Sequence, residues 1–256
     1  MAARSMERIL HRPLMHFYGI SNQVESEDRQ RLLDNIARRQ LAGIILAAPS
    51  WSLAGTPITD APDLPRVELS SGECALWPVI RTPKLQWLPT ALDWLAERKR
   101  QRVAFLFFNL EKVAGHEASI LDRALAERGM VSPAYLRQAP RWHDLAAVNH
   151  CVQLLMRAAP GERPDALIIT DDNLIEGAVE GLITAGARVS EEIDVVALAN
   201  FPLHSEPVLP IRLLAYDQRE VLRQAVELID RQRRREKVPP VTKIPILWQE
   251  SIETAG

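Results

Sequence analysis

The stretch from residue 164 to 203, PDALIITDDNLIEGAVEGLITAGARVSEEIDVVALANFPL, decides the fold class of this 256-residue chain. It opens with an apolar run at 166–170 that has the length and composition of a buried strand. Apolar residues spaced three and four apart, from Ile175 to Leu182, then predict a helix. A second apolar run at 193–199 predicts another buried strand. Strand, helix and strand in this order are typical of a parallel sheet with crossover helices.

The same alternation extends along most of the chain. Apolar runs at 42–48 and 102–108 predict two more buried strands, each after a helical pattern. IRLLAY at 211–216 and KIPILW at 243–248 predict two further strands. Because similar strand–helix units occur in two successive runs, we expect an α/β protein with two doubly wound parallel-sheet lobes.

The helix expected after residue 216 carries signals at both ends. Asp217 and Glu220 have the N-cap and N3 spacing of a capping box. The basic run RQRRREK at 231–237 is interpreted as a solvated helix end, where cations suit the helix dipole, in preference to a phosphate-binding surface.

Composition narrows the function classes. With 47% hydrophobic and 25% charged residues the chain should bury a sizeable core, and its net charge of -2 gives no electrostatic footprint for nucleic acid. Cys74 and Cys151 lie too far apart for a zinc motif or a disulfide scaffold, so a reducing cytoplasm is the default location. Since no window approaches 18 apolar residues, we expect no membrane span.

Two adjacent carboxylates, Asp171 and Asp172, follow the strand at 166–170. They lie where open parallel sheets bind ligands, beyond the carboxyl ends of the strands. The pair could serve as a general acid and base, as half of a metal site, as acceptors for ligand hydroxyls, or as a helix cap. Asn173 and Glu176 also have capping-box spacing, which favours the cap for Asp172. For Asp171, a cap and a ligand contact stay equal alternatives.

Catalytic and metal motifs are missing from the sequence. HEASI at 116–120 begins like a zinc-protease helix but has Ile120 where the second histidine belongs. No nucleophile elbow, Walker loop or dinucleotide-binding glycine motif is present. We therefore expect neither an enzyme nor a bound metal or cofactor.

Three blocks resemble one known family. The stretch 164–203 is similar to the effector-binding half of the lactose-repressor/galactose-repressor (LacI/GalR) family of transcription regulators. DQREVLRQAVELI at 217–229 and ILWQES at 246–251 agree with that family's next helix and closing strand, in order and spacing. The resemblance runs from about residue 17 to the end, and it is specific in the C-terminal half and only positional before residue 100.

The resemblance implies a periplasmic-binding-protein-like fold of type I, with two lobes joined by three crossings and an effector between them. It assigns 1–108 and 208–236 to the N-terminal lobe, and 109–207 and 237–256 to the C-terminal lobe. The family begins with a helix-turn-helix and a first strand, whereas this sequence starts where the resemblance places the helix that follows that strand. We therefore expect a truncated form that lacks this first strand and the DNA-binding module, unless MAARSMERILHR at 1–12 supplies a replacement.

Five residues match family positions that contact the effector or lie near it. The resemblance places all five in one ligand-binding site. They are Asp171, Asp172, Trp142, Asn200 and Glu117. Trp142 matches an aromatic residue that packs on the ligand ring, although a packing role is an equal alternative. Asn200 matches an acidic or amide position for which a turn role is favoured.

Two positions that align with the family's effector contacts depart from the family. Glu117 stands where the family has an arginine that holds effector oxygens, and Ala199 replaces an aspartate that accepts hydroxyls. Each lost charge-assisted contact is worth about 1.5–3 kcal/mol. A family-typical sugar held in the usual way should therefore bind poorly, so either the effector differs or none is sensed.

The expected function is the regulatory domain of a bacterial-type transcription regulator, such as a repressor. It would bind a small polar effector, a sugar or related molecule, form a homodimer, and contact DNA only through an upstream helix-turn-helix. The alternative is a solute-binding protein of a sugar transporter, which shares the fold. The closing block at 246–251 favours the regulator.

Overall fold

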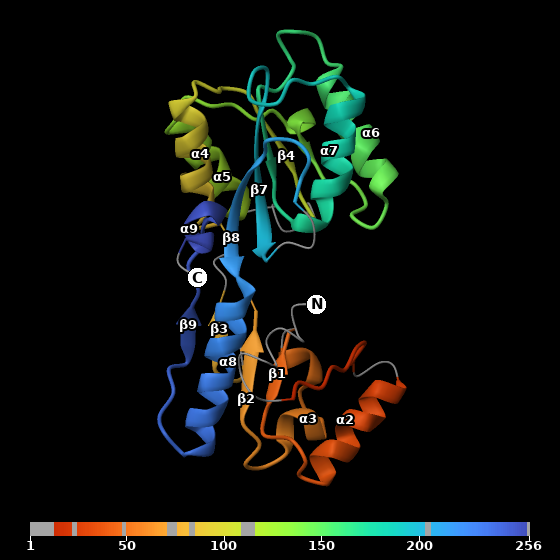
Figure 1. Ribbon diagram of the computed structural model, residues 1–256, viewed down its shortest axis with the longest axis vertical. Helices are drawn as coiled ribbons and strands as arrows, with labels where there is room; N and C mark the ends of the chain where they lie inside the picture. The colour runs from red at the N-terminus through yellow and green to blue at the C-terminus, as the bar shows by residue number, and fades with distance from the viewer. Residues whose placement is uncertain are drawn as a thin grey trace. The chain divides into compact units, whose positions relative to one another are not determined.

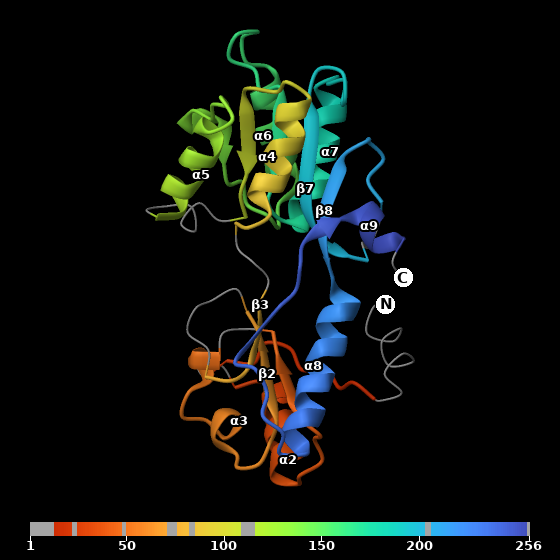
Figure 2. The same cartoon turned by 90° about the vertical axis from the view of Figure 1, so that its left-hand side faces the viewer.

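A computed structural model describes residues 13–21, 25–47, 50–70, 76–81, 85–108, 116–202 and 206–254. Within it the chain forms two compact units, Met1–Pro83 with Asp217–Pro245 and Lys84–Tyr216 with Ile246–Gly256. The chain therefore passes between the units three times. Each unit contains a parallel sheet and helices, so the predicted α/β class is confirmed (Figures 1 and 2). The segment 1–12 lies outside the described residues.

The first unit is built on a four-stranded sheet with the order β1-β2-β3-β9. Each neighbouring pair is parallel. The strands are β1 (Ile44–Leu46), β2 (Arg66–Leu69), β3 (Val79–Arg81) and β9 (Val241–Lys243). The helices are α2 (Glu27–Ala37), η1 (Ser50–Leu53), α3 (Pro57–Asp60) and α8 (Gln218–Arg233).

Two groups of helices build the first unit's core. Leu32, Ile44, Leu53 and Ile58 form a cluster that joins α2, η1 and α3 to β1. The long helix α8 packs on β2 and β3, and it buries one apolar stripe against them. The position of α8 beside β2 can be followed in Figure 2.

The second unit is built on a six-stranded sheet with the order β10-β8-β7-β6-β4-β5. The strands are β4 (Val103–Leu106), β5 (Arg137–Gln138), β6 (Ala166–Ile169), β7 (Asp194–Phe201), β8 (Arg212–Asp217) and β10 (Leu247–Trp248). Strands β5, β4, β6 and β7 run parallel, whereas β10 is antiparallel to β8.

Helices cover both faces of this second sheet (Figure 1). On one face α4 (Leu88–Glu97) and α5 (His116–Ala126) pack over Val103, Phe105 and Ile168. On the other, α6 (Leu145–Met156) and α7 (Ile175–Thr184) pack over the alternate residues of the same strands. The remaining short helices are η3 (Ala134–Leu136), η4 (Asp172–Leu174) and α9 (Gln249–Glu253).

The close contact between α6 and α7 depends on two glycines of α7. A Cβ atom on Gly177 would lie 2.9 Å from the carbonyl oxygen of Leu145, and one on Gly181 would lie 2.7 Å from that of Asn149. Because backbone atoms cannot move aside as a flexible side chain can, any larger residue would push the two helices apart. These glycines hold the layer that covers β6 and β7.

The division between the units differs from the one expected from sequence. Residues 84–108 belong to the second unit rather than the first, because β4 pairs with β5 and β6. Strand β8 also joins the second unit, while β9 pairs with β3 in the first. Apolar runs indicate that a strand is buried, but they do not specify which sheet it enters.

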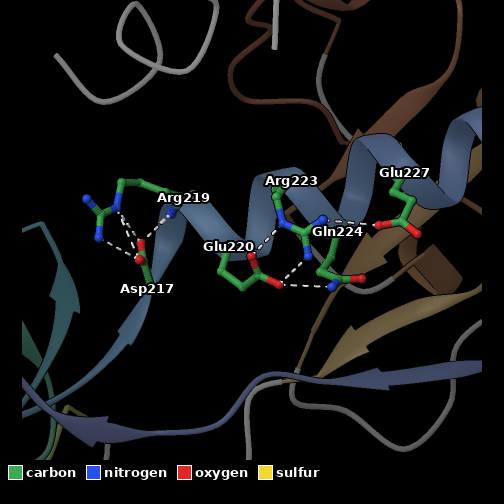
Figure 3. Close-up of polar contacts among 6 residues, drawn as sticks. All are labelled: Asp217, Arg219, Glu220, Arg223, Gln224 and Glu227. Carbon is green, nitrogen blue, oxygen red and sulfur yellow. Dashed lines mark hydrogen bonds and ion pairs between the residues drawn. The ribbon is translucent and has the colours of Figure 1, made fainter. Parts of the chain in front are cut away.

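The capping box expected at the start of α8 is only half formed, as Figure 3 shows. Asp217 is the N-cap and accepts from the backbone N–H of Arg219 at 2.8 Å. Glu220 does not cap; it binds the Arg223 guanidinium at 2.6 Å and the amide of Gln224 at 2.9 Å. The hydrogen bond from Arg223 lowers the pKa of Glu220. An ion pair along the helix face has replaced the second cap.

The basic end of α8 is a set of local ion pairs. Arg231 and Arg234 both bind Glu236, and Arg233 lies 3.7 Å from Asp230. These pairs are consistent with the solvated helix end favoured by the sequence. In the described part of the chain, no helix is long and apolar enough to cross a membrane.

Candidate functional site

The candidate site lies at the carboxyl edge of the second unit's sheet. Because β5, β4, β6 and β7 are parallel, the segments that leave them emerge at one edge, where open α/β sheets bind ligands. Phe108 follows β4, Trp142 follows β5, Asp171 and Asp172 follow β6, and Asn200 lies near the end of β7. Four of the five residues expected at the site therefore share this edge.

Asp171 caps the short helix η4. Its backbone is extended, and its Oδ1 accepts from the backbone N–H of Asn173 at 3.0 Å and from the Asn173 side-chain amide at 2.7 Å. The capping role, favoured for Asp172 from sequence, thus belongs to Asp171. Asn173 does not begin a capping box with Glu176, because α7 follows η4 directly and has Leu174 as its N-cap.

Asp172 forms a side-chain pair with Asn200. Its Oδ2 accepts from the Asn200 amide at 2.7 Å and lies 3.4 Å from the Asn200 backbone nitrogen. The register of β6 and β7 pairs Ile169 with Ala197, so residues three positions beyond each lie at the same level of the sheet. Both side chains are half-buried.

This pair leaves acceptor capacity at the edge. Asp172 Oδ1 has no hydrogen-bond partner among the residues that the structure describes. The partner of Oδ2 is a neutral amide, so the negative charge of Asp172 is oriented but not neutralised. A carboxylate in this state can accept a hydroxyl or ammonium hydrogen from a ligand.

Trp142 supplies an exposed aromatic surface. It stacks on Phe108, with ring centroids 5.3 Å apart and an angle of 25° between the rings, and His143 contacts it edge-on at 5.4 Å. Its exposed fraction is 42%, so the packing alternative accounts for part of the ring only. Sequence reasoning missed Phe108, although its place at the end of the apolar run 102–108 could have indicated it.

The other positions singled out by the resemblance add little polarity. Glu117 lies in the first turn of α5, and its side chain is outside the described part of the structure. Ala199 is 2% exposed and packs into the core with Leu174 and Ala197. The aspartate that the family has at this position is therefore replaced by an apolar side chain that faces the core.

The opposite, amino edge of the same sheet also carries aspartates. Asp194 opens β7, is 1% exposed, and binds Arg98 Nε at 2.7 Å and Arg100 Nε at 2.6 Å. The hydrogen bond with Asp194 raises the pKa of Arg98. Asp165 precedes β6 and accepts from the backbone N–H groups of Gln101 and Arg102 at 3.0 Å and 2.8 Å.

Neither a described cavity nor a described residue cluster offers another polar site in this unit. A cavity of about 160 Å³ between η3, β5 and α6 has no charged residue in its lining. Burial raises the pKa of Cys151, which lines it, to about 11, so that thiol is protonated and weakly reactive at neutral pH. Over the described ranges, no three His, Cys, Asp or Glu residues gather to hold a metal ion.

Comparison with known proteins identifies similar folds. The structure is similar to a LacI-family transcriptional regulator from Lactobacillus casei with bound glucose, at 19% identity and a TM-score of 0.72, covering 96% of this chain and 91% of that one. It is also similar to the Escherichia coli transcriptional repressor ascG, at 18% identity and a TM-score of 0.72, covering 96% and 89%.

A regulatory protein of the LacI family from Chloroflexus aggregans gives a TM-score of 0.74 at 15% identity, covering 95% of this chain and 88% of that one. No curated protein sequence matches this chain. These similarities confirm the periplasmic-binding-protein-like fold that the resemblance implied. The family model described as periplasmic binding protein-like domain matches residues 92–250. Since that match spans more than half of the sequence, the chain belongs to the periplasmic binding protein-like domain family.

Proposed function

We propose that this chain is the ligand-sensing regulatory domain of a LacI-type transcription regulator. The observation that carries the proposal is the pair of Asp172 and Asn200 at the carboxyl edge of the second sheet, with one carboxylate oxygen available. The exposed ring of Trp142 at the same edge offers an apolar surface for the face of a ligand. This combination suits a small molecule with hydroxyl groups and an apolar face, as a sugar ring has.

The similar structures support this ligand class. The regulator from Lactobacillus casei is described with bound glucose, with bound sucrose and with bound Tris, each of which carries several hydroxyl groups. For this chain we infer a polyhydroxylated effector held by contacts different from the family's, since Glu117 and Ala199 replace an arginine and an aspartate. Asp171, engaged as a cap, contributes less than Asp172.

In this proposal the effector acts by a population shift. A ligand changes the balance between two arrangements of a protein only when it binds one of them more tightly. The chain would transmit that shift to an upstream helix-turn-helix, as a homodimer in the cytoplasm, and would catalyse no reaction. The names of the similar proteins, all regulators, favour this role over that of a transporter's solute-binding protein.

A thermal-shift experiment with glucose and sucrose tests the proposal. At a hundred times its dissociation constant, a ligand that binds only the folded state adds about 2.7 kcal/mol of stability. We expect such a rise in melting temperature for the unaltered protein and its loss in a Trp142→Ala variant. The control is Tyr135→Ala, because Tyr135 is also an exposed aromatic residue of the second unit, at 43% against 42%. Equal shifts in both variants would show that Trp142 does not contact the ligand.

A further inference from the structure

Two buried side-chain polar atoms on the strands of the first unit have no hydrogen-bond partner in the described part of the chain. Glu68 of β2 is 1% exposed, and its Oε2 accepts from the backbone N–H of Ser50 at 3.1 Å. Its other oxygen, Oε1, is buried without a partner, and so is Nε of Arg81 at the end of β3. An unpaired buried acceptor of this kind is costly, which is why such groups are rare in folded proteins.

Both side chains lie on one face of the sheet, toward its carboxyl edge. Parallel pairing sets Glu68 beside Val79, and side chains alternate along a strand, so Arg81 shares that face two positions further on. Ser50, which follows β1, holds Glu68 from the neighbouring segment and accepts from the backbone N–H of Leu76 at 3.0 Å. The carboxylate is therefore fixed in place with one oxygen left over.

A second charged residue on this face of β2, Arg66, forms no described ion pair with Glu68. Arg66 is two positions earlier on β2, and its three guanidinium nitrogens donate to the carbonyl oxygens of Ile58, Leu64 and Ala61 at 2.7–2.8 Å. Glu68 and Arg81 form no ion pair with each other among the described contacts. An apolar side chain of similar size at position 68 would remove the unpaired oxygen, but it would also leave the buried backbone N–H of Ser50 without its acceptor.

We propose that Glu68 and Arg81 form a binding subsite of the first unit for a neutral polyhydroxylated molecule. One hydroxyl of the ligand donates to Glu68 Oε1, and a neighbouring hydroxyl accepts from Arg81 Nε. An anion would be repelled by Glu68 and a cation by Arg81, whereas a hydroxyl group both donates and accepts. The subsite adds to the proposed function and rests on it only for the choice of probe molecules.

Calorimetric titration of glucose and of sucrose into four proteins tests this subsite. In the Glu68→Gln variant the amide oxygen stays with the Ser50 N–H, so an NH₂ donor replaces the Oε1 acceptor. We expect the affinity for at least one probe to fall about tenfold or more in this variant and in Arg81→Met. Glu27→Gln, which alters an exposed acid of α2, should bind like the unaltered protein.

A fourth variant separates binding from folding. Glu68→Leu removes the unpaired oxygen and also the acceptor of the Ser50 N–H, so its melting temperature without ligand checks that it still folds, and it should bind neither probe. Unchanged affinity in a Glu68→Leu variant that still folds would overturn the subsite. Failure of the unaltered protein to bind either sugar would overturn the proposed ligand class.

Failure of the subsite at Glu68 can be distinguished from failure of the proposed function. Asp172→Ala and Trp142→Ala are titrated alongside the variants of the first unit. If only those two lose affinity, the proposed site in the second unit stands and the subsite at Glu68 is overturned. If only the Glu68 and Arg81 variants lose affinity, the subsite is supported and the proposed site at Asp172 is overturned.

Discussion

The two edges of the second unit's sheet use aspartate in opposite ways. At the amino edge, Asp194 is 1% exposed and two arginines share its carboxylate. At the carboxyl edge, Asp172 is half-buried, accepts from the side-chain amide and the backbone N–H of Asn200, and keeps one oxygen without a described partner. The negative charge of Asp194 is fully paired with two arginines, whereas the negative charge of Asp172 stays available to a ligand.

This difference separates residues that stabilise the sheet from residues that can recognise a ligand. Around Asp194, Arg100 also donates to the backbone carbonyls of residues 190–192, so one ion pair fixes the turn that leads into β7. A half-paired carboxylate such as Asp172 contributes less to folding, but it keeps an acceptor for a molecule from solution.

The largest expected effect is at Asp194. Replacing it with alanine leaves two arginines without their acceptor beside a buried position, and breaking a buried ion pair typically costs about 3–5 kcal/mol. Urea unfolding of Asp194→Ala should show a loss of that size. The control is Asp93→Ala, which removes an exposed acid paired with Arg128 and should cost less than about 1 kcal/mol. If the two variants lost similar free energies of unfolding, Asp194 would stabilise the sheet no more than an exposed acid does, and the contrast between the two edges would be contradicted.

A smaller effect is expected at Asp165. This residue caps the start of β4 by accepting from the N–H groups of Gln101 and Arg102, so alanine should lower the free energy of unfolding by about 1–2 kcal/mol. Hydrogen exchange measures the local consequence, because the amide hydrogens of these two residues should exchange faster in Asp165→Ala. Unchanged exchange would mean that Asp165 contributes nothing to the amino edge.

Sequence patterns predicted the strands of this sheet because buried parallel strands are continuous apolar runs. The runs at 102–108, 166–170 and 193–199 correspond to β4, β6 and β7. The patterns could not place β4 in the second unit, since every buried strand has the same composition whichever sheet it joins. The resemblance supplied the two-lobed fold but not the residues at which the units divide.

The candidate site was predictable only in part. Carboxylates that follow a strand indicated the right edge, yet the exchange of roles between Asp171 and Asp172 depends on the backbone angles of η4. The pairing of Asp172 with Asn200 joins residues 28 positions apart, and it follows from strand register rather than local pattern. The sequence did not indicate that Glu68 is buried, because a single acid in a short strand is typical of an exposed position.

Asp172→Ala tests the central claim most directly, through the melting temperature and the dissociation constant for glucose or sucrose measured on one preparation. Because Asp172 is half-paired, we predict a stability loss below about 1 kcal/mol together with an affinity loss of about tenfold or more. A large loss of stability with unchanged affinity would contradict the account, since Asp172 would then serve the fold as Asp194 does.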